Sequence, residues 1–224
     1  MDYVLGENEY GRYCIPAESR HRPAARAILA GEVWEPETTA FIADQGRHGD
    51  VVTGGAYFGD MLPAAAMGGH TVYAAEPNPV NFAAAQSTLE ANGIANVRLL
   101  NAGFGAKAGA RRIEVAAAGG EPHGGGSWIT SQLRISRRAA TRLPCALVVI
   151  DDLVPLERDV ALIHLDVEGF EKQALRGAMR TIERCLPQLL LESRPRSGHV
   201  ARRLASLGYR DVAEMDGNTL LSAR

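Results

Sequence analysis

From residue 50 onward, short apolar runs of strand type alternate with segments whose apolar residues recur at helical spacing. This alternation is typical of parallel strands, because each parallel strand needs a crossover that returns the chain to the same edge of the sheet. The sequence therefore predicts an α/β fold, with a mostly parallel sheet and helices on both faces. The predicted strands are 50–53, 71–75, 97–100, 146–150, 161–165 and 188–192.

The clearest predicted helix spans 79–92. Asn78 precedes it and can cap its first turn, and Pro79 suits the first helical position. Gly93 follows its last turn and is typical of a helix end. The helix lies between the second and third predicted strands, as a crossover should.

The C-terminal part continues the pattern and then ends in a hairpin. A second helix is predicted over 170–186, before Pro187, and a third near 198–207. Asp216 and Gly217 then lie between two strand-type runs, which favours a β-hairpin. We expect its two strands to close one edge of the sheet.

Two regions fall outside the alternation. Residues 1–46 show helical patterns broken at Pro36, and we expect them to form a helical flank or lid on the main domain of 47–224. Residues 116–144 are rich in glycine and arginine, and we expect a mobile loop there.

Composition and charge narrow the range of partners. The 24 basic and 26 acidic residues give a formal net charge of −2, so no overall field attracts nucleic acid or an anionic membrane. The three cysteines lie far apart and lack CxxC spacing, which favours neither a disulfide framework nor a cysteine zinc site. No apolar segment approaches the length of about 18 residues that spans a membrane. We expect a cytoplasmic protein with a small-molecule partner, no nucleic-acid or membrane partner, and at most further copies of itself.

A glycine turn follows the first predicted strand. Gly54, Gly55 and Gly59 would let the backbone approach a ligand at the carboxyl end of the sheet, where such folds bind ligands. Glu76 ends the second strand 21 positions after Gly55, close to the spacing at which an acid binds the hydroxyls of a ribose. The alternatives are a tight strand-to-helix turn and a favourable charge at a helix start. The spacing GxGxxG of nicotinamide enzymes is absent.

Several stretches together resemble the FkbM-type family of S-adenosylmethionine-dependent methyltransferases, over about residues 35 to 193. The resemblance implies a Rossmann-like, seven-stranded class I methyltransferase fold and transfer of a methyl group to a hydroxyl of a sugar or other natural product. Alternatives are transfer to an amine or peptide group, and a binding module without catalysis. The stretches are "EPET" (35–38), "GDVVTGGAYFGDM" (49–61), "AAEPNPVNF" (74–82), "LLNAGFGAKAG" (99–109), "GSW" (126–128), "HLDVEGFEKQALRGA" (164–178) and "PQLLLES" (187–193).

By this resemblance the methyl donor binds in the glycine turn and beside the next two strands. Thr53 and Tyr57 depart from the family pattern, which has an acid and an asparagine there. Thr53 cannot pair as a carboxylate with the ammonium of the donor, so backbone carbonyls and another acid, such as Asp60 or Asp166, would hold it. The predicted donor-binding residues are Thr53, Gly55, Ala56, Tyr57, Phe58, Gly59, Glu76, Pro77, Asn101 and Ala102.

The block "DVEGFE" lines the methyl side of the donor by resemblance. Asp166 is the first candidate for a base or metal ligand, and Glu168 is the second. For Glu168 a helix cap is the competing interpretation, and for Asp166 a polar strand end. His164 and His123 are further candidate bases. The competing interpretation is a satisfied core or surface histidine for His164 and a solvent-exposed loop histidine for His123.

Asp166 and Glu192 end neighbouring predicted strands and could share a divalent cation such as Mg²⁺. Asp151 and Asp152 are reserve ligands, although a helix or turn cap is the favoured interpretation for them. A basic run could bind an anionic group of the substrate, but a solvated face is favoured instead. The run consists of Arg134, Arg137, Arg138 and Arg142.

Overall fold

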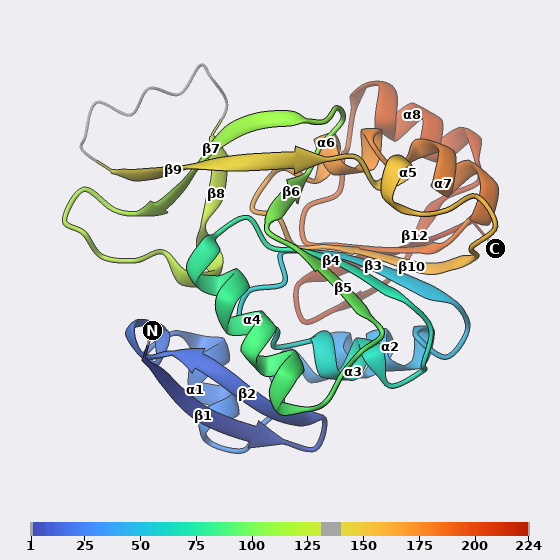
Figure 1. Ribbon diagram of the computed structural model, residues 1–224. Helices are drawn as coiled ribbons and strands as arrows, with labels where there is room; N and C mark the ends of the chain where they lie inside the picture. The colour runs from blue at the N-terminus through green and yellow to red at the C-terminus, as the bar shows by residue number, and fades with distance from the viewer. Residues whose placement is uncertain (1, 131–139, 224) are drawn as a thin grey trace.

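A seven-stranded sheet forms the centre of the computed structural model, which describes residues 2–130 and 140–223 (Figure 1). Its strand order is β12-β13-β11-β10-β3-β4-β5, and all neighbouring pairs from β11 to β5 are parallel. β13 and β12 form an antiparallel hairpin at one edge. The predicted sheet is thereby confirmed. The strands are β3 (Asp50–Gly54), β4 (Val72–Ala75), β5 (Val97–Leu100), β10 (Val160–Leu165), β11 (Gln188–Leu191), β12 (Arg210–Met215) and β13 (Asn218–Ser222).

Helices cover both faces of this sheet (Figure 1). Successive strand residues point to opposite faces, so Val51 packs in one apolar cluster with Ile42, and Val52 in another with Ile182. One face carries α2 (Pro36–Gln45), α3 (Leu62–Ala66) and α4 (Pro79–Ala91). The other carries α5 (Ile150–Leu153), α6 (Glu171–Arg176), α7 (Met179–Cys185) and α8 (Gly198–Ser206).

The helix predicted over 170–186 is two helices, α6 and α7. A Cβ atom on Gly177 would lie 2.1 Å from the carbonyl oxygen of Gly105, so the chain is pressed against its neighbour at this point. A residue distant in sequence caps the first turn of α7: the carboxylate of Asp151 accepts hydrogen bonds from the backbone N–H groups of Arg180 (3.0 Å) and Thr181 (2.8 Å). This is the cap favoured for Asp151 over metal binding.

A second sheet stands beside the first, with the order β6-β9-β7-β8. The strand predicted at 146–150 belongs to this second sheet, and Ile150 already begins α5. That prediction was wrong about the sheet because pairing between distant segments leaves no local pattern. The strands are β6 (Ala102–Phe104), β7 (Gly109–Ala116), β8 (Trp128–Thr130) and β9 (Thr141–Val148).

The segment 116–144 contains regular structure where one loop was expected. Its described part includes the short helix η2 (Gly124–Gly126), β8 and the start of β9. Of the predicted basic run, Arg142 forms an ion pair with Glu114 (Nε to Oε2, 3.0 Å). The other three arginines lie outside the described residues.

The N-terminal flank begins with a hairpin, which the predicted helical flank did not include. β1 (Tyr3–Asn8) pairs antiparallel with β2 (Gly11–Pro16), followed by η1 (Ala17–Ser19) and α1 (Pro23–Leu29). The hairpin packs on α4, since the backbone N–H of Cys14 donates to Thr88 Oγ1 (3.0 Å) and that of Arg12 to Asn92 Oδ1 (2.9 Å).

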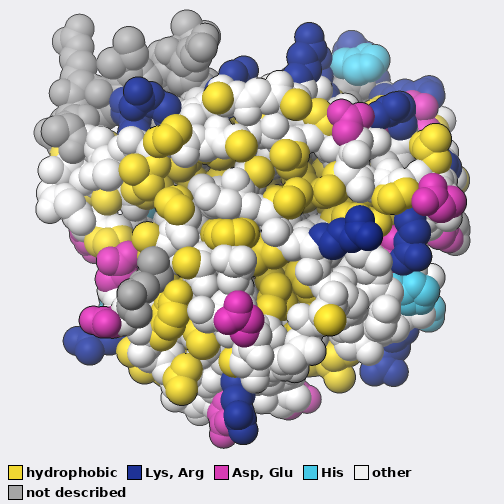
Figure 2. Space-filling view, in the orientation of Figure 1, with side chains coloured by type: hydrophobic (Ala, Val, Ile, Leu, Met, Phe, Trp, Pro, Cys, Tyr) yellow, Lys and Arg dark blue, Asp and Glu magenta, His cyan; other side chains and the backbone are white. Residues whose placement is uncertain are grey.

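On the face that carries α4, charged side chains lie mainly near the rim, and apolar ones are spread across the middle (Figure 2). Within 2–130 and 140–223, no helix has both the length and the hydrophobicity needed to cross a bilayer.

Candidate functional site

A cavity of about 300 Å³ opens at the carboxyl ends of β3 and β10. The strand order reverses between these two strands, which is where open α/β sheets bind ligands. The predicted site residues that line it are Thr53, Gly55, Ala56, Tyr57, His123, His164, Asp166 and Glu168. The fold therefore brings the glycine turn and the "DVEGFE" block together, as predicted.

A second, narrow cavity of about 20 Å³ shares Gly55 and Asp166 with the first. Glu76 and Pro77, both predicted to bind the donor, line it. The other walls come from Gly103, Phe104, Ile129 and Phe170, which were not predicted.

Glu76 is buried at the end of β4 and holds the glycine turn in place. Its two carboxylate oxygens accept hydrogen bonds from the backbone N–H groups of Tyr57 and Asn78, both at 2.8 Å. Burial raises the pKa of Glu76 to about 8, against the opposing effect of these two donors and of the Asn81 side chain. A carboxylate has about four acceptor positions, so the pair of hydroxyls of a ribose can still bind to it.

Position 55 requires glycine for two reasons. Its φ of 84° is in the left-handed region, and a Cβ atom would lie 1.8 Å from the carbonyl oxygen of Asp166. The glycine turn thus lies directly against the backbone of the candidate catalytic block.

Replacing Gly55 with alanine is expected to destabilise the protein by at least about 3 kcal/mol, because strain at positive φ is combined with overlap on a backbone oxygen. The matched control is Gly31→Ala, since Gly31 has a φ of 81° but a Cβ atom there would meet nothing within 4 Å. The control should lose only about 1 kcal/mol. Urea unfolding measures both, and equal losses would contradict the close approach described above.

Thr53 and His164 form a neutral pair on the floor of the cavity. They are register partners on β3 and β10, and Thr53 Oγ1 lies 3.0 Å from His164 Nδ1. Both side chains are buried, and burial lowers the pKa of His164 to about 4. His164 is therefore neutral near pH 7 and a weak base. Its Nε2 has no hydrogen-bond partner among the described residues.

The depressed pKa of His164 predicts loss of stability in acid. Its folded value of about 4 lies below the ordinary value of 6.5, so the unfolded chain binds more protons between these values and stability falls as pH falls through this range. We expect His164→Gln to reduce the loss measured by urea unfolding between about pH 7 and about pH 4.5. The exposed His70, replaced in the same way, should leave the loss unchanged.

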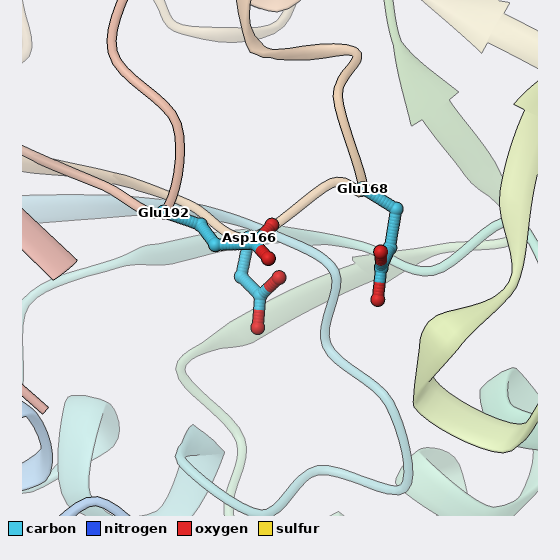
Figure 3. A group of neighbouring side chains, drawn as sticks. All are labelled: Asp166, Glu168 and Glu192. Carbon is cyan, nitrogen blue, oxygen red and sulfur yellow. The ribbon is translucent and has the colours of Figure 1, made fainter. Parts of the chain in front are cut away.

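Asp166, Glu168 and Glu192 lie together above the ends of β10 and β11. Each offers one carboxylate oxygen within 4.8 Å of the others, and the side chain of Glu192 extends toward Asp166 (Figure 3). Burial and the neighbouring carboxylate of Glu192 raise the pKa of Asp166 to about 9. Within the described part of the chain Glu168 accepts no hydrogen bond from the following turn; Glu171 does, since its Oε1 accepts from the N–H of Gly169 (3.2 Å).

Two further acids line the large cavity. Glu35 comes from the start of α2, where Asn218 Nδ2 donates to its Oε2 (3.0 Å). Asp60 lies in the turn after β3, and burial together with nearby Glu35 raises its pKa to about 7. Glu35 belongs to the stretch "EPET", which contributes to the family resemblance but predicts no role for this side chain.

Some predicted donor-binding residues lie outside both cavities. Phe58 is fully buried and packs its ring edge-on against Tyr13, with 6.4 Å between centroids. Asn101 Nδ2 donates to the backbone carbonyl of Glu76 (2.8 Å), and Gly103 and Phe104 take the place in the narrow cavity expected for Asn101 and Ala102. Gly59 also lies outside, against α4.

The segment around η2 covers the large cavity. Asn81 Nδ2 donates to the carbonyl of Gly124 (3.0 Å), and the guanidinium of Arg22 donates to the carbonyl of Pro122. His123 lines the cavity, with its ring 4.6 Å from that of Trp128 between centroids and its Nε2 3.8 Å from Glu114 Oε1. The segment thus connects α1 and α4 across the cavity.

A nucleoside fits this arrangement chemically but not without movement. The carboxylate of Glu76 has the acceptor chemistry that a ribose requires, while the narrow cavity of about 20 Å³ is too small for a purine. Ile129 packs directly on Gly103, because a Cβ atom there would lie 2.3 Å from Ile129 Cδ1. Binding of a purine between Pro77 and Phe104 therefore requires Ile129 or its neighbours to shift.

Comparison with known proteins identifies similar sequences and folds. Residues 54–210 match the model of the family described as the methyltransferase FkbM domain. No curated protein sequence matches the chain. A methyltransferase FkbM structure from Methylobacillus flagellatus KT is 19% identical, with a TM-score of 0.46, over 77% of this chain and 42% of that one. This chain thus spans less than half of that protein's length.

Two other solved structures cover most of this chain. A SAM-dependent methyltransferase from Aquifex aeolicus is 14% identical, with a TM-score of 0.42, over 89% of this chain and 91% of that one. A 16S rRNA N2 G1207 methyltransferase from T. thermophilus, in complex with AdoMet and guanosine, is 16% identical. Its TM-score is 0.49, over 99% of this chain and 50% of that one.

Proposed function

Because this chain belongs to the FkbM methyltransferase family, we propose that it transfers a methyl group from S-adenosylmethionine to a hydroxyl oxygen of a sugar or other natural-product small molecule. One observation carries the proposal: the glycine turn, Glu76 and Asp166 meet at the switch point of the sheet. Each of them has the chemistry that its part of a methyl-transfer reaction requires.

Glu76 and Pro77 hold the adenosine end of the donor. Glu76 accepts hydrogen bonds from the ribose hydroxyls, and Gly103 and Phe104 contact the base. Gly55 and Ala56, which line the large cavity, would hold the sulfonium end. Thr53 is neutral, so Asp60 and the backbone of the turn bind the ammonium group; Asp60 lines this cavity.

Asp166 and Glu168 orient the acceptor. When bound, the donor supplies an electrophilic methyl group, and the acceptor oxygen must lie in line with the sulfur. Asp166 lines both cavities, and this position supports it as the first candidate to take the hydroxyl proton. Glu168 is the second, and His123 is a further candidate from the covering segment.

The remaining parts of the function stay predictions. His164 contributes as a neutral hydrogen-bonding group, because its pKa of about 4 makes it a poor base. The acceptor is proposed to be a small molecule, and no step above depends on Mg²⁺. Cytoplasmic location and a homo-oligomer are expectations from the sequence alone.

The proposal is tested by calorimetry with S-adenosylhomocysteine and by transfer from a labelled donor to a panel of sugar alcohols and matched amines. We expect binding and label on alcohols. Label confined to amines would replace O-methylation by N-methylation. Absence of S-adenosylhomocysteine binding at high protein concentration would leave only a binding module with a methyltransferase fold.

A further inference from the structure

Three carboxylates from neighbouring parallel strands converge at one side of the large cavity. Asp166 and Glu168 follow β10, and Glu192 directly follows β11 (Figure 3). Each offers an oxygen within 4.8 Å of the others. Ligands on opposite sides of one Mg²⁺ ion lie about 4.2 Å apart, so small side-chain adjustments bring all three oxygens onto a single ion.

When these three carboxyl groups are ionised, no basic side chain beside them in the described part of the chain neutralises their charge. Glu35 and Asp60 line the same cavity. Among the described residues that line it, the only lysine or arginine is Arg22, whose guanidinium donates to the carbonyl of Pro122. Like charges at such separations repel one another, and a bound cation removes the repulsion.

His164 provides a second, independent indication of a ligand. It is only 3% exposed, its Nδ1 is engaged by Thr53, and its Nε2 has no partner within the part of the chain that the structure describes. His164 and Asp166 are two positions apart, so they lie on the same face of the chain, and both line the cavity. Buried polar atoms are nearly always hydrogen-bonded, so a water or hydroxyl within the cavity is the missing partner.

We propose that Asp166, Glu168 and Glu192 bind one Mg²⁺ or Mn²⁺ ion, which in turn binds the acceptor hydroxyl oxygen. Small divalent cations bind few protein carboxylates and keep oxygen ligands from water or substrate, and those ligands are hydrogen-bond partners for His164 Nε2. The inference rests on the methyltransferase function proposed above, because it assigns the ion to the acceptor side of that reaction.

The ion assists methyl transfer by making the bound hydroxyl more acidic. The hydroxyl proton passes to a carboxylate oxygen of the cluster that does not bind the ion. The oxygen–carbon bond forms as the carbon–sulfur bond breaks, and the electron pair of the broken bond stays on sulfur. The sulfonium thereby becomes a neutral thioether, and no further reactant is needed.

The test is Mn²⁺ binding to the full chain with saturating S-adenosylhomocysteine, followed by electron paramagnetic resonance and calorimetry. We expect one ion per chain, and affinities at least about tenfold lower in Glu168→Gln and Glu192→Gln. The matched control is Glu157→Gln, since Glu157 is exposed and lies outside the site. Thermal unfolding of each variant verifies that it is folded.

Absence of Mn²⁺ binding to the wild-type chain, or equal binding by both site variants, overturns the cation site. In that case, S-adenosylhomocysteine binding and methyl transfer in the presence of EDTA leave the proposed function standing. Conversely, Mn²⁺ binding without any S-adenosylhomocysteine binding in calorimetry overturns the methyltransferase function and the role given to the ion.

Discussion

Glu76→Gln is expected to weaken S-adenosylhomocysteine binding by about 100-fold, which corresponds to about 2.7 kcal/mol. The carboxylate is proposed to accept from both ribose hydroxyls, and hydrogen bonds to a charged group contribute about 1.5–3 kcal/mol each. In the wild-type chain the carboxylate accepts hydrogen bonds from the backbone N–H groups of Tyr57 and Asn78, both at 2.8 Å. In the variant the amide NH₂ faces one of these two donors, so that hydrogen bond is lost. The glycine turn then loses one of its anchors.

Calorimetry on the variant and on Glu90→Gln makes this measurement. Glu90 is an exposed residue of α4, so its replacement should leave affinity unchanged. Affinity should also rise with pH in the wild-type chain, because the pKa of Glu76 is raised to about 8 and ionisation strengthens its acceptance of ribose hydroxyls. Wild-type affinity in Glu76→Gln would remove the ribose contact from the proposed function.

Asp166→Asn is expected to lower kcat by about 100-fold to 10,000-fold, the range associated with loss of a general base. An amide can neither take the hydroxyl proton nor bind a cation as a carboxylate does. The shape of the side chain is kept, so we expect S-adenosylhomocysteine affinity to change by less than about tenfold.

The control for this experiment is Asp152→Asn. Asp152 is exposed, pairs with Arg180 (2.7 Å) and lines neither cavity. Its replacement should leave kcat unchanged. A kcat for Asp166→Asn within a factor of about ten of the wild-type value would assign proton removal to another group, with Glu168 the next to be tested.

Much of the main sheet could be predicted because its signals are local. The strand at 97–100 and the helix starting at Pro79 have apolar periodicity and end signals within a few residues. The second sheet could not be predicted in this way, since β6 pairs with β9 across some forty positions of chain. The break between α6 and α7 was also missed, because it depends on contact between Gly177 and Gly105.

The same difference between local signals and distant contacts decides which residues of the candidate site could be predicted. Gly55, Glu76 and Asp166 stand at strand ends, and the spacing of a βαβ unit places them together. Glu35 and Arg22 reach the cavity from the N-terminal flank, whose packing has no sequence pattern of its own. Asn101 has suitable chemistry for an adenine edge, but its amide is engaged by the carbonyl of Glu76, a contact that only coordinates reveal.

The flank that supplies Arg22, Trp34 and Glu35 precedes residue 54, where the match to the family model begins. On the function proposed above, the flank contributes part of the wall around the acceptor, whereas Gly55 and Glu76, which are proposed to bind the donor, lie within the matched stretch. If the flank selects the acceptor, relatives with a different amino-terminal segment should differ in what they methylate. Exchanging that segment between two such relatives tests whether the acceptor preference changes with it.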